Sequence, residues 1–175
     1  SQFAVSVPGT VHGWETALNQ YGRMTLREVL QPAIDYALNG YAVSEVIAHS
    51  WGSVETVAKL NHRPSGRQLL PGSDANGAPK YGEVVRLPEL GRTLQMIAEG
   101  GSEAFYKGEI AKKTVEFVQS EGGWLTEEDL ANHHSDWDEA ISVNYRGVDI
   151  WECPPNGQGI AALIALNLAE GFDIG

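Results

Sequence analysis

Residues 140–168 read AISVNYRGVDIWECPPNGQGIAALIALNL, and this stretch decides the fold class. The runs 140–143 and 148–153 are rich in β-branched and aromatic residues, which predicts two short strands. Tyr145-Arg146-Gly147 supplies the turn between them. One hairpin does not form a stable sheet by itself. It is therefore either an exposed addition to the fold or part of a larger sheet completed by residues outside this sequence.

The segment after the hairpin predicts a helix from Ile160 to Leu168 that is apolar on almost every side. Such a helix is buried rather than lying on a surface. It needs cover all round, so it favours the interpretation in which the hairpin belongs to a larger sheet. We therefore expect a β-hairpin plus a buried helix over residues 138–170.

The chain before the hairpin is predicted to be helical over residues 11–132. Apolar residues recur there at helical spacing in Val11–Tyr21, Leu26–Leu38, Glu45–Lys59, Pro88–Glu99, Glu109–Ser120 and Glu127–Leu130. The predicted fold class is α+β, mostly helical with one β-hairpin, and residues 1–175 are treated as a single segment.

Local signals set the expected helix ends. Thr25 and Glu28 have the spacing of a capping box, and Ser44 and Thr126 can each cap a following helix. Pro32 removes a backbone donor and clashes with the preceding turn, so we expect a break or kink there, with Pro32 opening a second helical piece. Gly40 fits a left-handed helix end.

Residues 61–81 begin with Asn61 and contain seven further residues that are proline, glycine or asparagine. They show no periodic apolar face, so we expect a long loop. A loop of more than about 15 residues is uncommon and is often a lid or a binding element. The alternative is a mobile excursion without a role.

Composition excludes several classes of function. The chain has 175 residues, 42% hydrophobic and 20% charged, which is typical of a folded globular protein. Its net charge of −11 repels nucleic acid and anionic lipid, and no apolar run approaches the roughly 20 residues of a membrane helix. We expect neither a nucleic acid nor a membrane as partner.

The single cysteine, Cys153, excludes an intrachain disulfide and a multi-cysteine zinc site. It is expected to be a small buried hydrophobe rather than a nucleophile. Cysteine usage does not distinguish the bacterial periplasm or secretion from the cytoplasm. The chain begins at Ser1 without an initiator methionine or a signal segment and stops at Gly175 after an apolar helix pattern. We expect both ends to be cut.

The residues offer no clear catalytic or metal constellation. His133 and His134 precede Asp136 and Asp138, but adjacent residues point in different directions and rarely chelate together. A serine nucleophile elbow and a phosphate-binding glycine loop are both absent from the sequence. The sequence therefore predicts no metal, no cofactor and no catalytic residue in this chain.

The loop between the second strand and the apolar helix is the most unusual local feature. Its candidate residues are Asn156, Gly157, Gln158 and Gly159, which follow two stiffening prolines. The glycines let a ligand or a second segment come close, and the helix N-terminus favours an anion. The loop is either close to a substrate or a rigid connector that satisfies a buried helix end.

Several short motifs also follow one another in the order of a known family. They are Val7-Pro8-Gly9-Thr10-Val11-His12-Gly13, Leu30-Gln31-Pro32-Ala33-Ile34 with Gly40, Ile97-Ala98-Glu99-Gly100-Gly101 with Phe105-Tyr106-Lys107-Gly108, Gly122-Gly123-Trp124-Leu125-Thr126-Glu127-Glu128-Asp129-Leu130-Ala131, and Tyr145-Arg146-Gly147 to Pro154-Pro155 with Gly159 and Leu163 to Phe172. This ordered set resembles the large subunit of gamma-glutamyltranspeptidases over nearly the whole chain.

The resemblance implies the αββα sandwich of N-terminal-nucleophile hydrolases. A family precursor cuts itself, and the new N-terminal threonine of the small subunit attacks a gamma-glutamyl amide with its own amine as base. That threonine lies downstream of the matching stretch, and the arginine that holds the substrate's carboxylate lies upstream. The implied partners are the remainder of the precursor, with the small subunit, and a gamma-glutamyl small molecule.

One departure concerns the substrate. The common family form is PPPSSGG where this chain has Cys153-Pro154-Pro155-Asn156-Gly157-Gln158-Gly159. This leaves gamma-glutamyl and other acyl amides open. The alternative to an enzyme segment is a helical interaction or binding module without catalytic activity.

Overall fold

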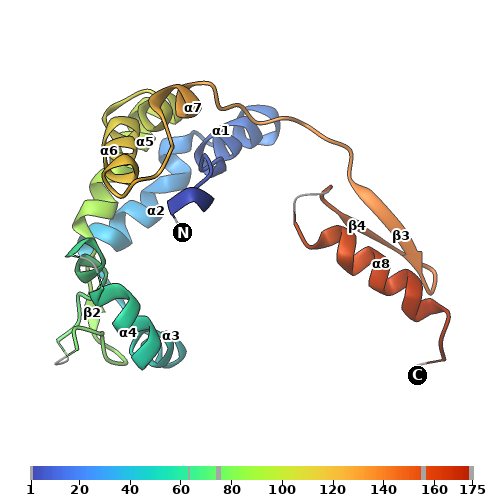
Figure 1. Ribbon diagram of the computed structural model, residues 1–175, viewed down its shortest axis with the longest axis horizontal. Helices are drawn as coiled ribbons and strands as arrows, with labels where there is room; N and C mark the ends of the chain where they lie inside the picture. Colours follow the sequence, from blue (N-terminus) through green and yellow to red (C-terminus); the bar gives the residue numbers. More distant parts are fainter. Residues whose placement is uncertain (1, 63, 74–75, 155–156, 174–175) are drawn as a thin grey trace. The chain divides into compact units, whose positions relative to one another are not determined.

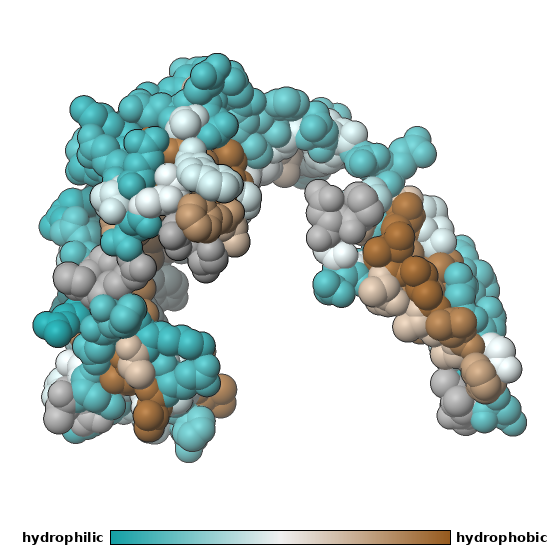
Figure 2. Space-filling view, viewed as in Figure 1, coloured by the Kyte–Doolittle hydropathy of each residue, from teal (hydrophilic) through white to brown (hydrophobic). Residues whose placement is uncertain are grey.

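The computed structural model describes residues 2–62, 64–73, 76–154 and 157–173, with the side chains of residues 2, 64 and 65 left aside. It divides into two compact units, Ser1–His134 and Ser135–Gly175 (Figure 1). Figure 2 shows the surface of both units in the same view, with hydrophobic residues in brown. Each unit is described by itself.

Unit 1, Ser1–His134, is helical. Its helices are α1 (Thr10–Tyr21), α2 (Leu26–Asn39), α3 (Glu45–Trp51), α4 (Val54–Asn61), α5 (Pro88–Tyr106), α6 (Glu109–Ser120) and α7 (Glu127–Ala131), with short 3-10 turns η1 (Gln2–Ala4) and η2 (Pro64–Leu69). Two residues of β1 (Tyr41–Ala42) pair antiparallel with β2 (Val84–Val85), a pairing that the sequence did not predict. Among the described residues no helix is long and apolar enough to cross a membrane.

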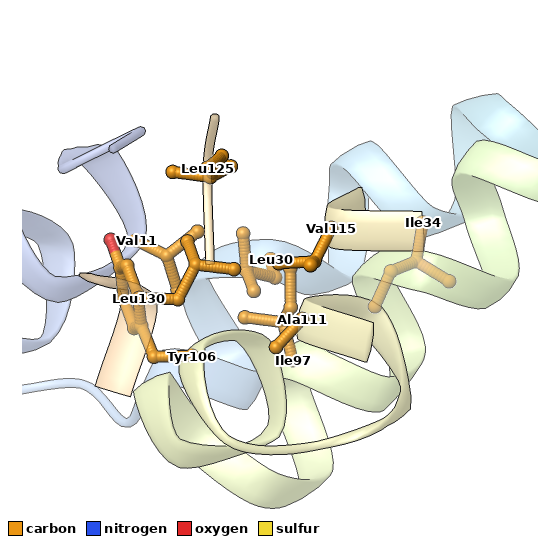
Figure 3. Close-up of a cluster of buried hydrophobic side chains, with 9 residues drawn as sticks. All are labelled: Val11, Leu30, Ile34, Ile97, Tyr106, Ala111, Val115, Leu125 and Leu130. Carbon is orange, nitrogen blue, oxygen red and sulfur yellow. The ribbon is translucent and has the colours of Figure 1, made fainter. Parts of the chain in front are cut away.

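The core of unit 1 lies where α2, α5, α6 and α7 meet. Figure 3 shows its buried side chains, which are Val11, Leu30, Ile34, Ile97, Tyr106, Ala111, Val115, Leu125 and Leu130. Leu130 on the short helix α7 is fully buried. The core therefore joins helices from both ends of unit 1.

The expected break at Pro32 is wrong, because α2 runs as one helix from Leu26 to Asn39 with Pro32 inside it. Leu30, Ile34 and Ala37 on the same helix are buried, while Pro32 faces solvent. Packing on both sides of the proline holds the helix together, and water can reach the carbonyl that the proline leaves unpaired. The predicted capping box of Thr25 and Glu28 is confirmed.

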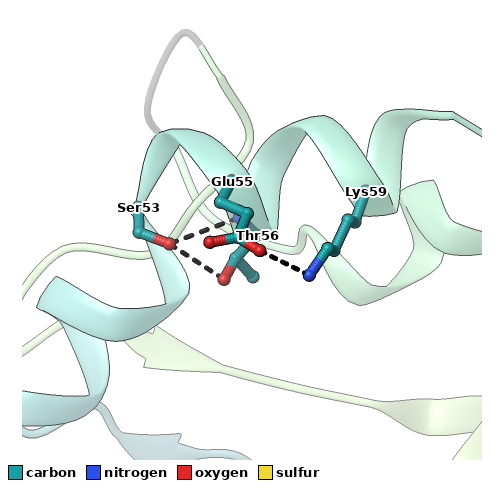
Figure 4. A network of polar contacts seen from close by, with 4 residues as sticks. All are labelled: Ser53, Glu55, Thr56 and Lys59. Carbon is teal, nitrogen blue, oxygen red and sulfur yellow. Dashed lines mark hydrogen bonds and ion pairs between the residues drawn. The ribbon is translucent and has the colours of Figure 1, made fainter.

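The predicted helix Glu45–Lys59 is two helices, α3 and α4, which part at Gly52. Ser44 caps α3 as expected. Ser53 caps α4, since its hydroxyl accepts from Thr56 N at 3.3 Å (Figure 4). The same network includes Lys59, which donates to Glu55 at 2.6 Å. The cap at Ser53 thus begins a new helix, although the apolar periodicity continues through this position.

Helix α5 consists of two helical pieces that meet at Gly101, so the helix predicted from Pro88 to about Glu99 ends where expected and a second piece continues to Tyr106. Gly101 has φ +66°, which favours glycine. Beyond it, the buried Ser102 donates both its backbone N–H, at 3.3 Å, and its hydroxyl to Glu15 of α1. A carboxylate from α1 therefore caps the second part of α5.

The segment predicted as the long loop 61–81 is partly ordered by its neighbours. Beyond η2, the Glu83 carboxylate accepts from the backbone N–H groups of Ser73, at 2.8 Å, and Lys80, at 2.9 Å. Ala78 is buried, as are Val43 and Val85. The described part of the segment is therefore tied by hydrogen bonds to Glu83, which directly precedes β2.

Unit 2, Ser135–Gly175, contains the predicted hairpin and helix. Strands β3 (Ile141–Tyr145) and β4 (Val148–Glu152) pair antiparallel from Ile141 with Glu152 to Tyr145 with Val148. Arg146 and Gly147 form the turn with φ +52° and +84°. Two successive positive φ values define the type I′ turn, whose twist suits a two-residue hairpin. The expected burial of Cys153 is wrong, because this residue lies just beyond the paired end of β4 and is exposed.

Helix α8 (Gly159–Glu170) packs against β3 and β4. The prediction of a buried helix is not met within this unit, because Leu163 alone among its described residues is buried. The hairpin covers one side of α8 and leaves the opposite side exposed. The apolar pattern thus correctly indicated a helix but not a covered one.

Candidate functional site

The loop before α8 was the candidate site, and its described part is Gly157, Gln158 and Gly159. Asn156 lies outside the described residues. Gly157 is exposed, and a Cβ added there would meet no heavy atom within 4 Å. The space around Gly157 is therefore open within unit 2.

Gln158 stands at the N-cap of α8 with φ −85° and ψ 1°. Its carbonyl accepts from Ala162 N at 3.0 Å, but its side chain makes no capping hydrogen bond. Gln158 is exposed, and its side-chain amide does not cap the helix.

Gly159 is the first residue of α8 and lies against Glu152, the last residue of β4. A Cβ at Gly159 would stand 2.8 Å from the Glu152 Cβ and 2.9 Å from its Oε2. Glycine is therefore needed for this close approach. A carboxylate of the same unit lies beside the positive end of the helix dipole, which weakens the expectation that the loop binds an anion.

The histidines of 133–138 do not form a metal site. His134 Nδ1 lies 3.2 Å from Asn132 O. His133 instead stacks on Tyr106, with ring centroids 5.0 Å apart, and meets the edge of His12 at 5.7 Å. In the part of the chain that the structure describes, no three His, Cys, Asp or Glu side chains gather as metal ligands.

Sequence reasoning missed the role of Tyr106, which ties the segment before α1 to α5. Its hydroxyl donates to Pro8 O at 2.6 Å and accepts from His12 N at 3.3 Å. Burial raises the pKa of Tyr106. The sequence could have indicated this role, because Tyr106 ends a predicted helical segment and a buried tyrosine hydroxyl usually has a hydrogen-bond partner.

Threonine hydroxyls of unit 1 serve local structure. Thr93 donates to Glu89 O at 3.0 Å and Thr114 to Ile110 O at 2.8 Å, both along their own helices. Thr16 Oγ1 lies 3.2 Å from His12 Nδ1, a contact between residues four apart on α1. Thr25 and Thr126 belong to capping boxes. These contacts are those of helices and not of a threonine paired with a free amine.

Comparison with known proteins decides the family. The family model described as Gamma-glutamyltranspeptidase matches residues 1–175. The chain belongs to this family. It is 37% identical over 171 residues to the "Glutathione hydrolase-like YwrD proenzyme" of Bacillus subtilis (strain 168), covering 97% of this chain and 32% of that relative.

Two solved structures show the same fold. One is the gamma-glutamyltranspeptidase of Helicobacter pylori, with a TM-score of 0.88 and 30% identity over all of this chain and 50% of that one. The other is the cephalosporin acylase of Bacillus halodurans, with a TM-score of 0.85 and 39% identity over 99% of this chain and 33% of that one. The resemblance inferred from the ordered motifs is confirmed, and the mostly helical α+β fold is that of a part of these enzymes.

The chain spans about a third of the length of the curated relative. The family consists of enzymes, so the match favours an enzyme segment over an interaction module.

Proposed function

We propose that the complete protein transfers or hydrolyses the acyl group of a gamma-glutamyl or related acyl amide. The attacking group is an N-terminal threonine outside this chain, whose own amine takes up the hydroxyl proton. The observation that carries the proposal is the family match over all 175 residues. The local roles of the threonine hydroxyls described above support a nucleophile located elsewhere.

The substrate class follows from the two kinds of relative. The similar proteins include a glutathione hydrolase-like proenzyme and a cephalosporin acylase, at 37% and 39% identity. The first name is that of a hydrolase-like protein for glutathione, and the second is that of an acylase. Gamma-glutamyl amides and other acyl amides are therefore both candidates, and the departure of Cys153–Gly159 from the common family form fits this breadth.

The chain itself acts as a scaffold segment of the large subunit in this proposal. Its partner is the remainder of its own precursor, including the small subunit with the nucleophilic threonine. The share of about 32% of the relative's length supports this role. Alone, the chain binds no substrate productively because it lacks the reacting group.

The loop Asn156–Gly159 is proposed to lie near the substrate. The exposed amide of Gln158 and the open surroundings of Gly157 support this. Replacing Asn156 and Gln158 together by alanine in the complete protein should raise KM for the amide substrate, with self-cleavage checked by gel. Unchanged KM and kcat in a fully processed enzyme would remove both residues from the site.

The activity is tested by comparing the complete reading frame with residues 1–175 alone. Both are assayed on a gamma-glutamyl anilide and on a glutaryl anilide as a second acyl amide. We expect turnover of at least one substrate by the complete, processed protein and none by the chain alone. The control replaces the N-terminal threonine of the small subunit by alanine and should be inactive. Turnover by the chain alone, or by the control, would overturn the proposed nucleophile.

A further inference from the structure

Asn76 and Gly77 form a turn in the segment between η2 and β2. Asn76 is exposed and Gly77 is half-buried, and Gly77 has φ +81°, which favours glycine. The side-chain oxygen Oδ1 of Asn76 accepts from Ala78 N at 3.0 Å. This is an Asx turn, in which the asparagine side chain folds back over the main chain that follows it.

The backbone after Asn76 is held by its neighbours. Gly72 N donates to Gly77 O at 2.8 Å, and a Cβ added at Gly72 would overlap the backbone of Ala78. Ala78 itself is buried. The main chain on which the Asn76 side chain folds back is therefore fixed in place, and the side-chain amide is kept beside it.

An asparagine that is followed by glycine can react with its own main chain. The glycine nitrogen loses its proton to hydroxide and attacks the side-chain carbonyl carbon, an approach that no glycine side chain obstructs. A C–N bond forms, the bond to the side-chain nitrogen breaks, and ammonia leaves with a proton from water. Water then opens the resulting succinimide ring, which gives aspartate or isoaspartate.

Two features of the turn favour this reaction at Asn76. The Ala78 N–H polarises the side-chain carbonyl and stabilises the negative charge that develops on Oδ1 during the attack, as an oxyanion donor does. Within the described ranges no group accepts a hydrogen bond from the Gly77 N–H, so base can remove its proton. We propose that Asn76-Gly77 is a site of spontaneous deamidation in the folded protein.

A second Asn-Gly pair, Asn39-Gly40, is held differently although Asn39 is also exposed. Gly40 N donates to Tyr36 O at 2.9 Å across the end of α2. Gly40 also lies against β2, since an added Cβ would stand 2.7 Å from Val84 Cγ1. Reaction at Asn39 therefore requires the end of α2 to open first. The third such pair in the sequence begins with Asn156, which lies outside the described residues.

The products of the reaction change the turn. Each adds a negative charge to a chain whose net charge is already −11. Isoaspartate also routes the main chain through the side-chain carbon and so lengthens the backbone between Gly72 and Gly77. The hydrogen bond from Gly72 N to Gly77 O closes this stretch, so isoaspartate should break it and loosen the buried Ala78.

The test incubates the complete protein at mildly alkaline pH and, in parallel, in urea that unfolds it. The tryptic peptides 68–80 and 28–59 separate the two pairs, and mass spectrometry with electron-transfer fragmentation distinguishes isoaspartate from aspartate. In the unfolded chain both pairs should react at similar rates. In the folded protein we expect Asn76 to react about tenfold faster than Asn39, because reaction at Asn39 first breaks a helix hydrogen bond.

The variant Asn76→Gln is the control for peptide 68–80, since the longer side chain does not form the succinimide, and it should yield no isoaspartate there. Equal rates at Asn76 and Asn39 in the folded protein, or folding that slows both pairs by the same factor, would overturn the proposal. A rate at Asn76 that does not rise with pH would also overturn it, because the attacking nitrogen must first lose its proton.

Discussion

The two units of this chain differ in how much of their apolar surface they bury. Among the described residues, unit 1 buries thirteen hydrophobic side chains and unit 2 buries Leu163 alone. Both contain long apolar patterns, but in unit 1 the helices α2, α5, α6 and α7 cover one another, whereas α8 is covered by two strands on one side. Unit 1 therefore forms a closed hydrophobic core, whereas the described residues of unit 2 do not.

The largest expected difference in stability is between truncating a buried residue of unit 1 and truncating an exposed residue of α8. Leu130→Ala in the isolated chain should destabilise unit 1 by about 2–5 kcal/mol, because it leaves a cavity in a closed core. Ile164→Ala on the exposed side of α8 should change the stability by less than about 0.5 kcal/mol, because that surface already meets water. Urea denaturation followed by circular dichroism measures both. Equal losses would remove the contrast between the two units.

The stability of the variant Pro32→Ala tests whether packing holds α2 together against the helix-breaking tendency of proline. Pro32→Ala restores a donor and relieves a clash worth about 3 kcal/mol, offset by about 0.4–1 kcal/mol from a more flexible unfolded chain. We expect a net gain of about 2 kcal/mol in the free energy of unfolding. A loss of stability would mean that the ring itself contributes packing that exposure does not suggest.

Tyr106→Phe tests the tie between the segment before α1 and α5. The change removes the hydroxyl that bonds Pro8 O and His12 N, and we expect a loss of about 1–3 kcal/mol because a partner is left unsatisfied. Tyr36→Phe is the matched control, since Tyr36 is 62% exposed. If both variants unfold at the same urea concentration, the tie is not what positions the segment.

The smallest effect concerns pH. Hydrogen bonds from Thr25 lower the pKa of Glu28 from its ordinary 4.5, and those from Thr126 lower that of Asp129 from 3.8. A lowered pKa in the folded state means that the stabilisation is present above the ordinary value and is lost as pH falls below it. Glu28→Gln should thus lower the Tm at pH 7 slightly and change it less at pH 3. A difference that grows on acidification would reverse the sign of this linkage.

How much the sequence could predict also differs between the units. Helix ends signalled by a side-chain cap, such as Thr25 and Thr126, and the turn at Arg146-Gly147 were predictable, because their chemistry is local. The uninterrupted α2 was not, since the packing of Leu30 and Ile34 outweighs Pro32 only in the folded state. The break at Gly52 was missed because Ser53 caps inside a continuing apolar pattern.

For the site, the sequence indicated a loop next to a helix start but could not show Glu152 beside Gly159, because that approach depends on where β4 ends relative to α8. The contacts of Tyr106 with Pro8 and His12 join residues more than ninety positions apart, and no local pattern predicts them. Burial of α8 was predicted from its composition alone. An apolar composition favours burial of the helix, but within unit 2 only one side of α8 is covered.

Hydrogen exchange measures the difference between the units most directly. In residues 1–175 alone, amides of α2 and α5 should exchange slowly, while those of β3, β4 and α8 should exchange close to the rate of an unfolded chain, since local stability follows buried contacts. In the complete protein the amides of α8 should become as slow as those of α2. Slow exchange of α8 in the isolated chain would contradict the account, because unit 2 would then be stable without a partner.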